Sequence, residues 1–187
     1  MNTLAAVALA IWVALSAAGL RIWLPARQTG KPPLLARTGP LITIVAALAV
    51  GTVAVAVLAG LAAPLSRPWP WAAYAAAAMA ALLTGGPMTA CLLALADAST
   101  RPVSPRVQPT ILRGGAWIGA LERLAMAAAI LAGWGAGIAV IVALKGLGRY
   151  PELRAGQGTG AAERFIIGTF ASCGWAAACA GIGLLLR

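Results

Sequence analysis

The sequence contains no histidine, and only four of its 187 residues are acidic. The lack of histidine removes the commonest general base and the commonest zinc ligand. Two-metal chemistry requires a cluster of carboxylates, and one aspartate with three glutamates is a poor supply. An enzyme is therefore the least favoured class of function, and we expect neither a metal site nor a cofactor.

Cysteine is also scarce, and Cys91, Cys173 and Cys179 all lie in apolar stretches. Cys173 and Cys179 are six residues apart, a spacing that puts them on different faces of a helix and does not match the C-x-x-C motif. Nothing in this pattern indicates a disulfide framework or a zinc site. We interpret the three thiols as small hydrophobic side chains of the interior.

Charge of either sign is rare. Charged residues make up 10% of the chain and hydrophobic residues 61%, with a mean hydropathy of +0.91, whereas soluble domains carry roughly 25% charged residues. Several stretches of about 18 residues or more have no charge, enough to cross a ~30 Å hydrocarbon layer. The sequence predicts one all-α domain over residues 1–187, a polytopic transmembrane helix bundle.

The few charges are mostly basic, and the formal net charge is +10. In a soluble domain this excess would suggest nucleic acid, but here the basic residues lie between apolar segments, so we expect no nucleic-acid partner. Such a distribution is typical of cytoplasmic loops that attract anionic lipids. We expect a multi-pass protein of the bacterial cytoplasmic membrane whose partners include anionic lipids.

The apolar segments and the basic loops together predict six spans. The first segment is followed, not preceded, by basic residues, so it is interpreted as a retained span with its N-terminus outside. The basic loops 25–38, 97–113 and 146–161 are expected inside. The spans are expected at about residues 3–24, 39–65, 71–96, 113–132, 137–150 and 162–186.

A five-span alternative joins residues 116–144 into one helix. It places Lys145, Arg149 and Arg154 outside, against the positive-inside rule. Glycine-dense sequence is also where a helix ends or turns, and the stretch AGWGAG contains three glycines. We therefore prefer a helical hairpin over residues 113–150, turning at Gly133, Gly135 and Gly137.

Another glycine cluster, TGGPM, lies inside the third span. We expect Gly85, Gly86 and Pro87 to break the regular helix within residues 83–88, because proline cannot donate to the helical ladder and its ring clashes with the carbonyl of Leu83. A simple kink is the favoured interpretation. A break that lines a substrate path is the alternative.

The hairpin gives Glu122 a partner. It lies 13 residues before Gly135, while Lys145 and Arg149 lie 10 and 14 residues after it, or roughly 20, 15 and 21 Å from the turn. Glu163 and Arg164 open the last span. We expect six charges to converge at the cytoplasmic edge: Glu122, Arg123, Lys145, Arg149, Glu163 and Arg164. They either only hold the helices together or form an anion or lipid-headgroup site, with the basic residues binding and the glutamates orienting them.

The segment from Trp117 to Ser172 contains the motif IGALER, then Lys145 and Arg149, and then the motif AERFIIGT. In these motifs the chain resembles a family of uncharacterised bacterial membrane proteins, a domain of unknown function. The resemblance places the family's motif on Glu122, Arg123, Lys145, Arg149, Glu163, Gly168 and Thr169. The family's N-terminal segment with histidine and aspartate has no counterpart here, and the resemblance implies no activity.

Among function classes, a structural, accessory or interaction protein is favoured, because it requires no catalytic group and no substrate path. Small-residue spacings such as Gly115-x-x-x-Gly119 and Gly133-x-x-x-Gly137 allow close helix packing within a homo-oligomer or a larger membrane complex. The alternative is an oligomeric transporter or channel for a small solute or lipid, to which broken helices and inward-facing charges would belong.

Overall fold

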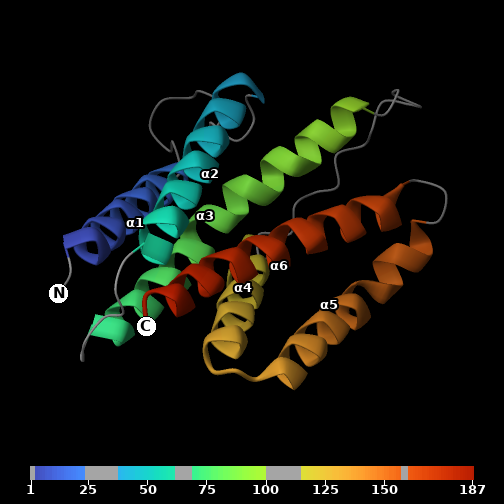
Figure 1. Ribbon diagram of the computed structural model, residues 1–187. Helices are drawn as coiled ribbons and strands as arrows, with labels where there is room; N and C mark the ends of the chain where they lie inside the picture. Colours follow the sequence, from blue (N-terminus) through green and yellow to red (C-terminus); the bar gives the residue numbers. More distant parts are fainter. Residues whose placement is uncertain (1–2, 24–37, 62–68, 100–114, 157–159) are drawn as a thin grey trace.

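The computed structural model describes residues 3–23, 38–61, 69–99, 115–156 and 160–187, and within these ranges all regular structure is helical (Figure 1). The helices are α1 (Thr3–Trp23), α2 (Thr38–Leu61), α3 (Trp69–Ser99), α4 (Gly115–Leu131), α5 (Gly135–Ala155) and α6 (Ala161–Leu185). The expected all-α class is confirmed for this part of the chain.

Three helices are long and apolar enough to cross a membrane. These segments are Ile42–Leu61 in α2, Pro70–Asp97 in α3 and Ala161–Leu185 in α6, and α1 adds a shorter apolar stretch, Thr3–Ala18. Large apolar side chains such as Val50, Val53 and Phe170 are exposed on these spans. Over the described residues, this agrees with the expectation of a membrane protein.

Helix α3 lies at the centre of the bundle and packs most extensively against α6, with α1 and α4 also in contact (Figure 1). Gly183 of α6 lies beside Ala77, and Gly168 lies beside Leu93. Residue numbers therefore increase along α6 while those of the contacting residues in α3 decrease, so the two helices are antiparallel. Leu131 of α4 also approaches Gly183, which places the end of α4 beside the end of α6.

The core between these helices is built largely from alanine. Small side chains let helix backbones approach closely, which is the main source of packing energy where lipid replaces water. Gly183 shows how close the approach is, since a Cβ added there would lie 2.9 Å from the Cβ of Ala77. The buried core alanines include Ala5, Ala8, Ala73, Ala77, Ala80, Ala81, Ala127, Ala176 and Ala180.

The expected helical hairpin is present in α4 and α5, which are separate helices. Gly133 adopts a φ of 69°, a conformation that side chains with a Cβ disfavour, and Trp134 donates its backbone N–H to the Ala129 carbonyl at 2.8 Å. The expected end of the second arm at residue 150 is wrong, because α5 continues through Pro151 to Ala155. This adds about 8 Å to the arm.

The expected interruption of the helix at Gly85, Gly86 and Pro87 is also wrong, because α3 is one helix from Trp69 to Ser99, whereas the kink at this position stays a prediction. Proline removes one ladder bond, and membrane helices tolerate this where neighbours and hydroxyl side chains satisfy the backbone. Pro87 is fully buried, and Thr89 beside it donates its hydroxyl to the Gly85 carbonyl at 2.8 Å. Close packing thus keeps the helix continuous.

The close contact of α3 and α6 predicts a difference between two glycines of α6. Gly183→Ala should lower the free energy of unfolding by about 1–3 kcal/mol, the usual cost of overpacking, because its Cβ would overlap that of Ala77. Gly181→Ala is the matched control, since no atom lies within 4 Å of the added Cβ. Thermal unfolding in detergent should rank Gly183→Ala below both wild type and the control, and equal midpoints would contradict this packing.

Candidate functional site

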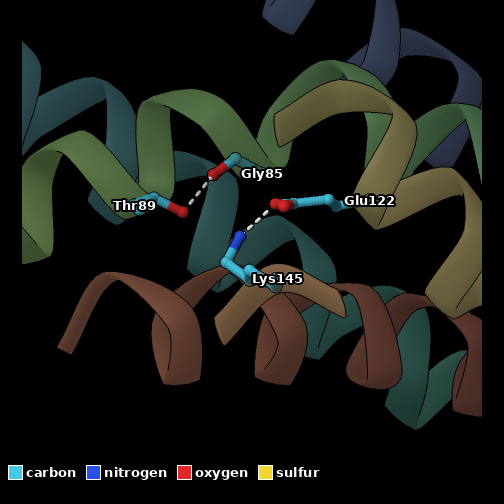
Figure 2. A network of polar contacts seen from close by, with 4 residues as sticks. All are labelled: Gly85, Thr89, Glu122 and Lys145. Atoms are coloured by element: carbon cyan, nitrogen blue, oxygen red, sulfur yellow. Dashed lines mark hydrogen bonds and ion pairs between the residues drawn. The ribbon is translucent and has the colours of Figure 1, made fainter. Parts of the chain in front are cut away.

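An ion pair joins the two arms of the hairpin. The Nζ of Lys145 in α5 donates to the Oε2 of Glu122 in α4, and Figure 2 shows the two side chains pointing toward one another. Their side chains are only 13% and 20% exposed, respectively. The partner expected for Glu122 from the hairpin register is therefore confirmed, and Lys145 is the basic residue that provides it.

Arg123 follows Glu122 but faces a different part of the bundle, because each helical residue turns by about 100°. It is 4% exposed. Its Nη2 donates to the Leu82 carbonyl of α3 over a long 3.4 Å, and its buried Nε has no hydrogen-bond partner. A cation in this position is costly, because removing a charge from water is repaid only by good partners.

Gly85 makes room for this arginine. A Cβ at Gly85 would lie 2.4 Å from the Cδ and 2.8 Å from the Nε of Arg123. The same Cβ would lie 3.2 Å from Cδ1 of Trp175 in α6. Arg123 therefore lies where α3, α4 and α6 meet, and the glycine expected to break α3 is the one that accommodates the guanidinium.

Thr84 and Trp175 complete the wall of this position. The indole Nε1 of Trp175 donates to the Thr84 hydroxyl at 2.8 Å, and that hydroxyl donates to the Ala80 carbonyl at 2.6 Å. Sequence reasoning missed both residues. The available signal was a tryptophan in the middle of an apolar span, since a buried indole N–H usually has a partner.

We call Glu122, Arg123 and Lys145 the mid-bundle group. Gly85, which contacts Arg123, lies 15 residues from Pro70 and 12 from Asp97, the two ends of the α3 candidate span, or about 22 and 18 Å. Trp175 is likewise central in α6. The expected position at the cytoplasmic edge therefore does not hold for these three residues, which lie halfway along the two candidate spans.

The remaining predicted site residues lie elsewhere. Arg164 pairs with Asp97, which joins the start of α6 to the end of α3. Glu163 is exposed in the first turn of α6, and Arg149 is exposed one turn beyond Lys145. The six charges thus do not form one group, because α5 is longer than expected and carries Lys145 away from the end of the bundle.

Two further polar groups lie on α6. Cys173 lies two residues before Trp175 and is partly buried. Thr169 lies one turn earlier on the same helix, and its buried hydroxyl has no hydrogen-bond partner. Two buried polar atoms without a protein partner are therefore found here: the Nε of Arg123 within the mid-bundle group, and the Oγ1 of Thr169 on α6.

Within the described ranges, no three Cys, Asp or Glu side chains gather as a metal-binding set. The groups that do gather are a guanidinium, an ion pair and hydroxyls, which hold anions and water rather than cations. Comparisons of the chain with protein families, curated proteins and solved structures gave no match.

The ion pair predicts a non-additive response to neutralisation. Glu122→Gln leaves the Lys145 ammonium unpaired and should lower the free energy of unfolding by about 3–5 kcal/mol, whereas replacing both partners can be nearly neutral. The double variant Glu122→Gln/Lys145→Gln should therefore unfold at a higher temperature than Glu122→Gln alone. A double variant as unstable as the single one would show that the pair does not set the stability of the hairpin.

Proposed function

We propose that the protein is a six-span protein of the bacterial cytoplasmic membrane, an accessory or interaction protein that acts through the mid-bundle group. The observation that carries this proposal is the placement of the buried Arg123 and the partly buried Glu122–Lys145 pair together, halfway along two candidate spans. Charged residues at such depth are rare and mark functional positions by default.

A purely structural role fits these charges poorly. Each charged residue at the centre of a membrane helix costs about 2.5–3.5 kcal/mol on insertion scales. A buried ion pair can often be replaced by apolar residues without loss of stability. Arg123 takes no part in the pair, and its hydrogen bonding is incomplete. Recognition of another molecule accounts for this arginine better than helix packing does.

The arrangement of the helices supports the six-span topology with both termini outside. The Arg164–Asp97 pair places the end of α3 and the start of α6 together. The turn at Gly133 follows Leu131, which lies at the opposite end of α6 beside Gly183. The end of α3, the end of α5 and the start of α6 then lie on one side of the bundle, which is the side that the positive-inside rule predicts to be cytoplasmic.

The resemblance to uncharacterised bacterial membrane proteins is part of the same proposal. Its IGxxER segment supplies Glu122 and Arg123, and its lysine is Lys145, so three of its motif positions form the mid-bundle group. Anionic lipids and a larger membrane complex are the proposed partners.

An oligomeric transporter or channel for a small solute or lipid is the second candidate. It is favoured by α5, which packs mainly against α4 and exposes Val140, Leu144 and Leu147.

Size measurement in a mild detergent separates the two functions. A symmetric homo-oligomer would favour the pore, whereas a monomer that co-purifies with another membrane protein would favour the accessory role. Loss of that partner in a stable Glu122→Gln/Lys145→Gln variant would assign the role to the mid-bundle group.

Cysteine labelling in a cysteine-free background tests the topology. Gln108→Cys, between α3 and α4, and Arg154→Cys, in the last turn of α5, should react with a membrane-impermeant maleimide only after the cells are opened, because both positions are proposed to be cytoplasmic. Trp134→Cys, at the exposed hairpin turn, should react in intact cells. Labelling of Arg154→Cys from outside would exclude six spans and restore the five-span alternative.

A further inference from the structure

The chain contains too few acidic residues to neutralise Arg123. Of its four carboxylates, Asp97 pairs with Arg164 and Glu122 pairs with Lys145. Glu163 lies 12 residues before Trp175 on α6, about 18 Å along the helix. Glu152 lies seven residues beyond Lys145 on α5, about 10 Å along its axis. The mid-bundle group therefore keeps a net charge of +1 from its own residues.

We infer that the mid-bundle group binds a small monovalent anion, a halide or a short carboxylate, at the guanidinium of Arg123. The inference deepens the proposed function and rests on its placement of α3 and α6 across the membrane. A single negative charge would balance the group. The unpartnered Nε of Arg123 would donate the new hydrogen bond, which is stronger when both members are charged.

The depth of Arg123 distinguishes a soluble anion from a lipid headgroup. The hydrocarbon layer is about 30 Å thick, so headgroup phosphates lie about 15 Å or more from its middle. Arg123 contacts Gly85 midway along the α3 candidate span. A headgroup would have to enter the apolar layer to reach it, whereas a small anion bound between helices would not carry acyl chains with it.

The packing around Arg123 sets the size of the anion. Gly85 lies against the arginine side chain, with 2.4 Å between the position of a Gly85 Cβ and the Arg123 Cδ, and Cδ1 of Trp175 lies 3.2 Å from the same Cβ position. Such close packing favours a compact anion over a large one. A water molecule would satisfy the Nε but would leave the charge of the group unbalanced.

The test uses the purified full-length protein in a neutral detergent. Gluconate is exchanged for bromide or formate at constant ionic strength, while the thermal unfolding midpoint is followed. A ligand that binds only the folded state raises the midpoint with its concentration. We expect a saturable rise in wild type and at least a tenfold weaker apparent affinity in Arg123→Gln. Arg154→Gln, an exposed basic control on α5, should respond like wild type.

Tryptophan fluorescence provides a second readout that needs no change at Arg123. Bromide held beside Trp175 should quench a saturable part of the emission. Trp175→Phe should lose this part, and Trp12→Phe, a buried control on α1, should keep it. If Arg123→Gln does not fold, this comparison decides. Equal saturable quenching in both tryptophan variants would overturn the inference.

Two further outcomes would also overturn it. A midpoint that responds only to phosphate or to phosphatidylglycerol micelles would assign the site to a phosphate group or a lipid headgroup, and a midpoint that responds to no anion would leave water as the occupant of the Arg123 position. Either result leaves the proposed topology standing, because that topology is tested separately by cysteine labelling.

Discussion

The burial of Arg123 where α3, α4 and α6 meet is the constraint on which the centre of this bundle depends. The guanidinium fits only because Gly85 has no side chain, and Trp175 and Thr84 close the same position through a hydrogen bond of 2.8 Å. Burial of this one cation therefore constrains which side chains α3, α4 and α6 can carry where they meet. In a low-dielectric interior a buried cation is costly, and these contacts leave that cost only partly compensated, because the Arg123 Nε has no protein partner.

The alanine-rich core is what allows Arg123 to contact more than one helix. Alanines such as Ala77, Ala80 and Ala127 bring the helices close enough for side chains from three of them to meet. Close packing also explains why Pro87 lies inside an unbroken helix, since its neighbours hold the turn that lacks one backbone bond. The same packing leaves little room around Arg123, and this limits any occupant to a small one.

Reasoning from the sequence found the ion pair but not its location. The distances of Glu122 and Lys145 from the glycine turn are similar, and the two residues lie on the two arms of one hairpin. Their spacing in the sequence was therefore enough to predict that they lie side by side. The depth of the pair depended on where α5 ends and on how α4 lies against α3. Pro151 was expected to lie outside the helix, yet α5 continues through it to Ala155. The Arg164–Asp97 pair was missed because its members are 67 residues apart.

The sequence by itself determined the apolar helices, a turn within the glycine-rich residues 133–137 and the pairing of Glu122 with a basic residue of the next helix. Each of these follows from composition or from periodicity within one continuous segment, where helical geometry relates every residue to its neighbours. Only the tertiary structure decided that Arg123 turns away from Glu122 toward Gly85 and Trp175, and that this contact lies midway along α3 and α6. Contacts between distant helices depend on how small and large side chains fit together, and no spacing along the chain encodes that fit.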